Sequence, residues 1–332
     1  MTCTVSIVKL KIASMDYIFF HTVTGNEKLL LHWLKKAKPD WRLSFSAPGW
    51  VTVKTSKLED ISNLECPLAL RWGRGLKVLT KELSAEICLE LLTQNKAASL
   101  HYWERAEIKG LNKMELQFST EISFNKKLEP GQLSLQIMKI NHALYGIGLT
   151  NYLPPQSPLV GSSNIFNLPE GCPSRAYLKL AHLDEFYCFP WKVGDLVLEV
   201  GSAPGGISSY LIEKKLEVFA VDSAEMKLAH PKLHTLKQSV QQLQPQDIPN
   251  DVCWVVSDLN LSPNQTLNEV VRLSGHLNLK GLIVTIKLPQ LEMVWRLNEY
   301  VEKIKKNFPG LEVSLRQVCS HKQETHLVAF KK

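Results

Sequence analysis

The stretch LEVGSAPGGISSYLIEKKLEVFAVD, residues 198–222, decides the fold of the C-terminal half of this chain. An apolar run over 196–200 predicts a strand, the segment after Gly206 predicts a helix, and a second apolar run ends at Asp222. The turn between the first strand and the helix holds three glycines and one proline. Such a turn is either a tight strand-to-helix connection or a binding site for a nucleotide-like ligand.

Strands and helices alternate regularly on both sides of this stretch. A helix is expected over 175–187, and further helices between most of the strands expected at 196–200, 218–222, 234–239, 253–259 and 281–287. The chain closes with a predicted hairpin of 312–318 and 325–330. This alternation indicates an α/β fold, namely a Rossmann-like domain with a mostly parallel sheet. The hairpin would insert a terminal antiparallel strand into that sheet.

The N-terminal half has a different pattern. Strands are expected at 16–23, 70–79, 98–105 and within 132–150, a hairpin at 41–55, and helices at 26–37 and 80–94, the second capped by Thr80. We interpret this order as a small α+β domain with a ferredoxin-like core. Residues 151–174 are rich in Pro, Ser, Gly and Asn and predict a connecting loop. The expected domains are therefore 1–150 and 175–332.

Composition places the chain among ordinary globular proteins. It has 45% hydrophobic and 21% charged residues, and no run of 18 apolar residues that would predict a membrane helix. The N-terminus lacks the features of an export signal. The seven cysteines are scattered without a CxxC pair, and the ten histidines are interpreted as surface or core residues. We therefore expect a cytoplasmic protein with neither a disulfide framework nor a metal site.

The positive charge lies mainly in the N-terminal half. Residues 1–150 carry 20 Lys+Arg and 14 Asp+Glu, whereas the whole chain has a net charge of +7. Such a surplus of positive charge is compatible with binding to RNA phosphates, but it does not demonstrate RNA binding. Five tryptophans of this half are expected mainly in the core. Trp72, flanked by Arg71, Arg74 and Lys77, is the best candidate among them for stacking on RNA bases.

The sequence of the glycine turn limits the classes of ligand that it could bind. Its sequence G-S-A-P-G-G differs from the dinucleotide fingerprint GxGxxG, and Pro204 lacks the N–H that a pyrophosphate would need. Asp222, at the end of the second strand, is placed to accept hydrogen bonds from ribose hydroxyls. A ligand with a ribose but no phosphate fits this pattern, and we expect S-adenosylmethionine.

Four charged residues are expected near this turn. Asp258 and Lys287 end the fourth and fifth strands, Glu324 begins the last, and Lys179 lies on the preceding helix. All four then approach the carboxyl edge of the sheet, where α/β proteins bind ligands. Lys287 near another cation should lose its proton readily and could take one from a sugar hydroxyl. Taken singly, each of the four residues is explained as well by a solvated charge near the end of a strand as by a role in a site.

The segments PSRAYLKL, LEVGSAPGGIS, VVSDL, VTIKLP and HKQETHLVAF, in this order, resemble the FtsJ-type ribose 2′-O-methyltransferases. Within that superfamily the resemblance is strongest to the enzymes that modify bacterial large-subunit rRNA. It covers about 171–332 with specific motifs. It covers the N-terminal half more weakly, where those enzymes carry a THUMP-like RNA-binding domain.

The resemblance implies a catalytic tetrad of Lys179, Asp258, Lys287 and Glu324, with Lys287 as the proton acceptor. It also implies contacts to S-adenosylmethionine from the turn and its surroundings. These residues are Ser174, Gly201, Ser202, Ala203, Pro204, Gly205, Gly206, Asp222, Ser239 and Asp258. Ser239 departs from the family pattern, which has an acid there on the adenine side of the cofactor, and a serine is a weaker acceptor.

The expected function is thus methylation of an RNA ribose, on a cytidine of large-subunit (23S) rRNA or its precursor particle. A 2′-O-methyltransferase of tRNA or of an mRNA cap is an alternative, as is a catalytically silent RNA-binding protein of this fold. A dinucleotide-dependent reductase is disfavoured by the absence of GxGxxG. The sequence leaves the oligomeric state open.

Overall fold

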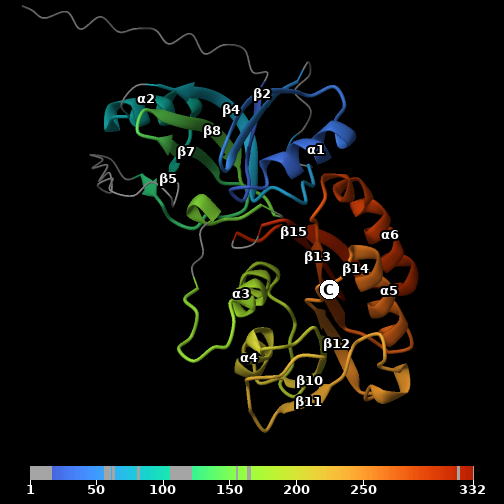
Figure 1. The fold of residues 1–332 in the computed structure, drawn as a ribbon. Coiled ribbons are helices and arrows are strands. Elements are labelled where there is room, and N and C mark those ends of the chain that lie inside the picture. The colour runs from blue at the N-terminus through green and yellow to red at the C-terminus, as the bar shows by residue number, and fades with distance from the viewer. Residues whose placement is uncertain are drawn as a thin grey trace, which may run out of the picture.

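The computed structural model describes residues 17–55, 61, 64–80, 83–104, 122–154, 156–162, 166–319 and 322–331. Two sheets make up the described part of the chain, one from each half (Figure 1). The N-terminal sheet, coloured blue to green, lies above the C-terminal sheet, coloured yellow to red. The protein is therefore an α/β chain with an N-terminal domain followed by a Rossmann-like C-terminal domain.

The N-terminal sheet has eight strands in the order β2-β3-β1-β4-β8-β7-β5-β6. Its strands are β1 (Tyr17–His21), β2 (Arg42–Ala47), β3 (Trp50–Lys54), β4 (Arg71–Leu79), β5 (Ser99–Glu104), β6 (Ser123–Phe124), β7 (Leu133–Asn141) and β8 (Leu144–Asn151). The sheet is mixed because β5 pairs in parallel with both β6 and β7. The ferredoxin-like, THUMP-like assignment of this domain stays a prediction.

Two helices belong to this half, α1 (Glu27–Ala37) and α2 (Ala85–Asn95). The expected cap at Thr80 is wrong, because α2 begins five residues later. Ser84 caps it instead, since its side chain accepts a hydrogen bond from the amide of Ile87.

Trp72, the best candidate among the tryptophans for stacking on RNA bases, lies in the core instead. Trp72 is only 1% exposed, and its indole Nε1 donates to the carbonyl of Ile61 at 3.0 Å. Its neighbour Arg71 is fully buried and donates to Ser157 O and to His101 Nδ1. Neither side chain is therefore accessible to an RNA base.

The C-terminal sheet has seven strands in the order β11-β10-β9-β12-β13-β15-β14. They are β9 (Leu196–Val200), β10 (Glu217–Asp222), β11 (Leu233–Lys237), β12 (Val252–Ser257), β13 (Gly281–Lys287), β14 (Glu312–Arg316) and β15 (Glu324–Phe330). The five strands from β9 to β13 pair in parallel, and β15 lies antiparallel between β13 and β14. The predicted mostly parallel sheet with a terminal antiparallel strand is confirmed.

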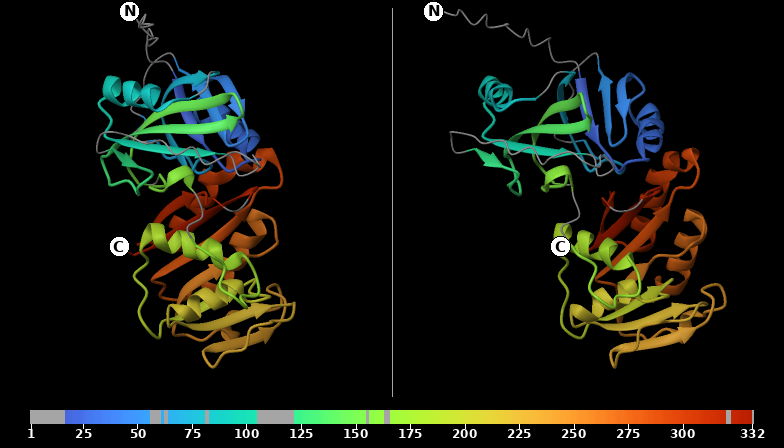
Figure 2. Two further views of the ribbon diagram at one scale, coloured as in Figure 1. Left: turned by 90° about the vertical axis from the view of Figure 1, so that its left-hand side faces the viewer. Right: turned by 60° about the vertical axis from the view of Figure 1, so that its left-hand side comes forward.

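Helices cover both faces of this sheet (Figure 2). On one face α3 (Ala176–Tyr187) and α4 (Gly206–Glu213) pack over Val197, Val218 and Trp254. On the other, α5 (Pro263–Ser274) and α6 (Leu297–Asn307) pack over Leu198 and Leu282. Three short 3₁₀ turns, η2 (Val160–Ser162), η3 (Pro245–Asp247) and η4 (Leu291–Arg296), complete the fold.

The two domains share a core. Ile18 and Phe20 of β1 and Leu30 of α1 belong to the same buried apolar cluster as Leu297 and Leu327 of the C-terminal domain. At the rim of this contact His32 stacks on Trp295 with ring centroids 4.3 Å apart. The N-terminal domain is therefore packed directly against the sheet that carries the candidate site.

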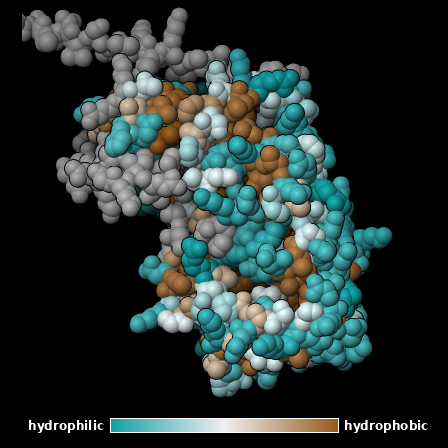
Figure 3. Space-filling view, in the orientation of Figure 1, coloured by the Kyte–Doolittle hydropathy of each residue, from teal (hydrophilic) through white to brown (hydrophobic). Residues whose placement is uncertain are grey.

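The surface seen in Figure 3 is mainly hydrophilic, with separate apolar patches.

Candidate active site

The glycine turn lies at the carboxyl end of β9, where the strand order of the sheet reverses. Gly201 and Gly205 have φ of +79° and +114°, which favour glycine. A Cβ on Gly201 would lie 2.8 Å from the carbonyl oxygen of Asp258, and one on Gly206 would overlap Ser174 Oγ. The peptide between Ala203 and Pro204 is cis. The turn therefore requires glycines because it packs tightly between two other segments of the site.

Asp222 holds this turn in place. Its Oδ2 accepts a hydrogen bond from the amide of Ala203 at 3.0 Å, and its Oδ1 accepts one from Ala224 N at 2.8 Å. The carboxylate thus joins the turn after β9 to the segment after β10. Each oxygen has a further lone pair that remains for a ribose hydroxyl.

A cavity opens beside this carboxylate, lined by the turn, by the segment after β10 and by β11. Its lining residues are Ser202, Ala220, Asp222, Ala224, Glu225, Met226, Thr235, Leu236 and Lys237. Ser202 Oγ is buried, and no other described residue offers it a hydrogen bond. An acid, a buried hydroxyl in want of a partner and apolar side chains suit an adenosine group, so the residues present fit S-adenosylmethionine.

Two predicted cofactor contacts, Ser174 and Ser239, are absent from the described lining of this cavity. Ser174 precedes α3, and its Oγ accepts a hydrogen bond from Ala176 N at 3.3 Å. Ser239 follows β11 by two residues and is half-buried, and its carbonyl accepts from Gln242 N at 3.0 Å. Among the described residues Ser239 is not part of the cavity lining.

The four charged residues expected to meet do meet. Lys179 Nζ lies 2.8 Å from Asp258 Oδ2 and 3.1 Å from Glu324 Oε1. Lys287 Nζ lies 3.1 Å from Asp258 Oδ1 and 2.8 Å from Glu324 Oε2. Each lysine therefore contacts both acids and each acid contacts both lysines. The result is an alternating, formally neutral ring of charges at the carboxyl edge of the sheet.

Electrostatics within the ring favour the charged forms. Burial alone would raise the pKa of Asp258, but Lys179 and Lys287 outweigh it and lower this pKa to about 2. Burial would likewise raise the pKa of Glu324, and His326 with the two lysines lowers it. For Lys287 burial acts to lower the pKa, and Asp258 and Glu324 raise it above its ordinary value.

This last result corrects the expectation that Lys287 loses its proton readily. That expectation considered the neighbouring cation and burial, but two carboxylates in direct contact stabilise the ammonium more than Lys179 destabilises it. Lys287 is nevertheless the more accessible lysine, since 26% of its side chain is exposed against 8% for Lys179. A substrate can therefore reach Lys287 more readily than Lys179.

The sequence interpretation missed Glu199, which lies inside β9 and is 1% exposed. It accepts a hydrogen bond from Ser208 Oγ of α4 at 2.5 Å. Burial raises its pKa to about 8, and the negative charges of Asp258 and Asp222 add to the effect. The sequence does carry a signal for Glu199, since this single acid interrupts the apolar run LVLEV directly before the glycine turn.

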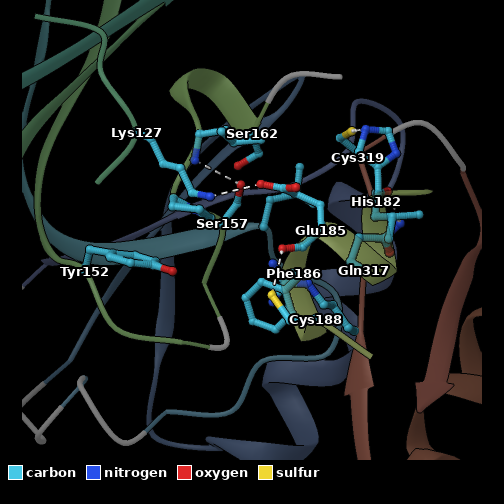
Figure 4. A pocket seen from close by; sticks show the side chains of 15 residues that line it. Lys127, Tyr152, Ser157, Ser162, His182, Glu185, Phe186, Cys188, Gln317 and Cys319 are labelled. Atoms are coloured by element: carbon cyan, nitrogen blue, oxygen red, sulfur yellow. Dashed lines mark hydrogen bonds and ion pairs between the residues drawn. The ribbon is translucent and has the colours of Figure 1, made fainter. Parts of the chain in front are cut away.

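A second cavity lies between the two domains (Figure 4). Lys127 and Tyr152 of the N-terminal half face Glu185 and His182 of α3 across it, and Lys127 Nζ bonds Glu185 Oε1 at 2.9 Å. None of the four ring residues and none of the turn residues lines it. This interdomain cavity is therefore separate from the ring of charges and from the glycine turn.

No group of three or more His, Cys, Asp or Glu side chains in the described ranges lies together as a metal site would require. In the same ranges, every helix is too short or too polar to cross a membrane.

Comparison with known proteins finds similarities in the C-terminal part of the chain. Residues 172–314 match the FtsJ-like methyltransferase family. Over 146 residues the chain is 27% identical to the ribosomal RNA large subunit methyltransferase M of Laribacter hongkongensis, covering 41% of this chain and 40% of that protein. Over 141 residues it is 28% identical to an uncharacterized protein of Methanocaldococcus jannaschii, covering 40% of each. The chain thus spans about two-fifths of the length of these relatives.

Solved structures that resemble the whole chain do so weakly. TrmN from Thermus thermophilus is 16% identical, with 95% of this chain and 99% of that chain covered at a TM-score of 0.33. A possible methylase from Clostridium difficile 630 is 10% identical, with 95% and 98% covered at a TM-score of 0.34. At these scores neither similarity supports a conclusion.

Proposed function

The C-terminal domain of this chain belongs to the FtsJ-like methyltransferase family, and on that basis we propose that the protein methylates a ribose 2′-hydroxyl of RNA. The observation that carries the proposal is the ring formed by Lys179, Asp258, Lys287 and Glu324. Its four contacts, each between 2.8 and 3.1 Å, lie at the carboxyl edge of the sheet. The ring and the adenosine-type cavity adjoin the same turn, because the carbonyl of Asp258 closes over Gly201.

S-adenosylmethionine, when bound, supplies an activated methyl group on a sulfonium centre. The protein then has to orient a hydroxyl and remove its proton. Lys287 Nζ, in its neutral form, would take the proton of the hydroxyl that receives the methyl group. Asp258 and Glu324 hold the amine in position, and Lys179 offsets their charge. The raised pKa of Lys287 makes its neutral form scarce at neutral pH, so the rate should rise with pH.

Asp222, Ser202 and the turn from Gly201 to Gly206 would bind the cofactor. Asp222 offers its remaining lone pairs to ribose hydroxyls, and Ser202 Oγ has an unmet hydrogen bond inside the cavity. Ser174 supports the turn from outside, since it leaves no room for a side chain at Gly206. Ser239 would offer a neutral hydroxyl on the adenine side, where the family pattern has an acid.

Two observations support a particular RNA substrate: the names of the relatives and the positive charge of the N-terminal half. Two relatives are ribosomal RNA large subunit methyltransferases M, so we propose a cytidine of large-subunit rRNA or its precursor particle as the target. Residues 1–150, with their excess of positive charge, would form a THUMP-like domain that holds RNA through phosphates and shape. Residues 151–174 would connect it to the catalytic domain at 175–332.

The test is methyl transfer from labelled S-adenosylmethionine to unmodified large-subunit rRNA by the wild type and by Lys287→Ala. The wild type should incorporate label at a 2′-oxygen, and Lys287→Ala should lose about 100-fold or more of the rate. Equal incorporation by both would remove Lys287 from its role. Labelling of tRNA or capped mRNA in place of rRNA would identify another RNA substrate.

One observation favours a second candidate, a catalytically silent RNA-binding protein. Ser239 replaces the acid that the family has on the adenine side, and a weaker acceptor there lowers cofactor affinity. Calorimetric titration with S-adenosylmethionine separates the two. Measurable binding supports the enzyme, whereas RNA binding without any cofactor binding supports the silent protein.

A further inference from the structure

The residues on both sides of Glu324 are held by the N-terminal domain. Gln323 N donates a hydrogen bond to Asn26 Oδ1 at 2.9 Å, and Thr325 Oγ1 donates one to the carbonyl of Pro67 at 2.9 Å. Asn26 directly precedes α1 and Pro67 precedes β4, so both belong to the N-terminal domain. Glu324 of the charged ring therefore lies between two hydrogen bonds that join the C-terminal domain to the N-terminal domain.

Asn26 is an unusual helix-capping residue. Asparagine before the first turn of a helix normally accepts a hydrogen bond from that turn, as Ser84 and Ser262 do for α2 and α5. Asn26 makes no such bond to α1. Its side chain is fully buried, and Nδ2 donates to Gln317 Oε1 at 3.2 Å while Oδ1 accepts from Gln323. The side chain thus serves the partner domain and not its own helix.

Gln323 needs such support. It has a φ of +55°, in the left-handed region that non-glycine residues rarely adopt, and surrounding contacts must hold it there. Its N–H is bound by Asn26, and its carbonyl accepts from the amide of Leu288 at 2.6 Å. Leu288 follows Lys287 in the chain. The same peptide segment therefore positions both Glu324 and the residue next to the proposed proton acceptor.

We infer that Asn26 is a positioning residue, through which the N-terminal domain sets the place of Glu324 in the ring. The inference rests on the proposed function, because it presumes that Glu324 acts on Lys287 during methyl transfer. It gives the N-terminal domain a second task besides RNA binding. A catalytic domain whose Asn26 contact is lost keeps its cofactor cavity but holds Glu324 less firmly against Lys287.

The test uses full-length Asn26→Ala, Asn26→Asp and Gln317→Leu with wild type. Asn26→Ala removes the acceptor of the Gln323 amide, and we expect kcat to fall about 10- to 100-fold while KM for RNA and cofactor affinity stay within about twofold. Asn26→Asp keeps an acceptor and should retain most of kcat. Gln317→Leu breaks the other bond of Asn26, so it should lower the melting temperature but leave kcat near wild type.

Two further readouts separate positioning from general damage. Hydrogen exchange of the peptide that contains Gln323 and Glu324 should accelerate about tenfold in Asn26→Ala and remain unchanged in Gln317→Leu. The acidic limb of the kcat–pH profile should move to lower pH in Asn26→Ala, because Glu324 then raises the pKa of Lys287 less. Equal losses of kcat in Asn26→Ala and Gln317→Leu, or unchanged exchange in Asn26→Ala, would overturn the inference. A wild type without methyl transfer would refute the proposed function, and the exchange experiment would still decide the role of Asn26.

Discussion

Lys287 and Glu324 lie directly opposite each other in β13 and β15, and their Nζ and Oε2 atoms are 2.8 Å apart. The pairing is antiparallel, so the last residue of one strand meets the first residue of the other at the carboxyl edge of the sheet. An inserted antiparallel strand therefore has a chemical consequence. It brings an acid from late in the chain to the carboxyl ends of the parallel strands, beside Asp258 and Lys287.

Replacing Glu324 by Gln should move the pH dependence of methyl transfer. The charge of Glu324 raises the pKa of Lys287, so its removal lowers that pKa and increases the neutral fraction at a given pH. We expect the acidic limb of the kcat–pH profile to shift to lower pH, with a reduced plateau because Lys287 is held less well. Measurement of kcat between pH 6 and 10 checks this, and a shift to higher pH would contradict it.

Replacing Lys287 by Arg should separate charge from basicity. The guanidinium keeps a positive charge between Asp258 and Glu324 but cannot act as a base, because its pKa exceeds 12. We expect near-wild-type thermal stability and cofactor affinity together with a loss of about 100-fold or more in kcat. Single-turnover methyl transfer measures the rate, and calorimetry measures the affinity. Substantial activity in this variant would exclude proton acceptance by Lys287.

Replacing Ser239 by Asp should tighten cofactor binding. The family pattern has an acid at this position, and a carboxylate is a stronger hydrogen-bond acceptor than a hydroxyl. We expect about a tenfold lower Kd for S-adenosylmethionine, which corresponds to ~1.4 kcal/mol. Ser239→Ala serves as the control, and its affinity for S-adenosylmethionine should not exceed that of the wild type. An unchanged Kd in Ser239→Asp would mean that Ser239 lies outside the adenine contact.

Replacing Gly206 by Ala should damage the cofactor turn. The new Cβ would overlap Ser174 Oγ and would lie 2.7 Å from the carbonyl of Ser174. We expect a stability loss of about 1–3 kcal/mol and weaker binding of S-adenosylmethionine. Gly171→Ala is the matched control, since Gly171 has a φ of +76° but nothing near its Cβ position. It should lose some stability and keep its cofactor affinity.

Replacing Glu199 by Gln should change how stability depends on pH. The folded-state pKa of Glu199 is raised to about 8 from an ordinary 4.5, so its contribution is full below pH 4.5 and declines as the pH rises through 8. Gln resembles the protonated form at every pH. The melting temperature of Glu199→Gln relative to wild type should therefore increase by about a few °C between pH 5 and 8. Parallel melting curves over this range would contradict the burial argument.

The elements of the C-terminal domain were largely predictable, because hydrophobic periodicity and the glycine turn leave few other folds for that half. Strands β9 and β13 match their predicted bounds, and Asp222 ends β10 as expected. The convergence of the four charged residues also followed once the sheet was taken as parallel with an inserted strand. In the N-terminal half the same reasoning found most strands and helices but missed β6 and named Trp72 as a candidate for base stacking, because local periodicity does not reveal which side chains the tertiary fold buries.

Local sequence by itself determined the order of strands and helices, the need for glycine in the turn and which charged residues end the strands. These features depend on backbone sterics and on the spacing of apolar residues along the chain. Only the tertiary structure decided the pKa of Lys287, the role of Glu199 and the contact between Asn26 and Gln323. Each of these depends on distances between residues far apart in sequence, and electrostatic and hydrogen-bond energies change steeply over those few ångströms.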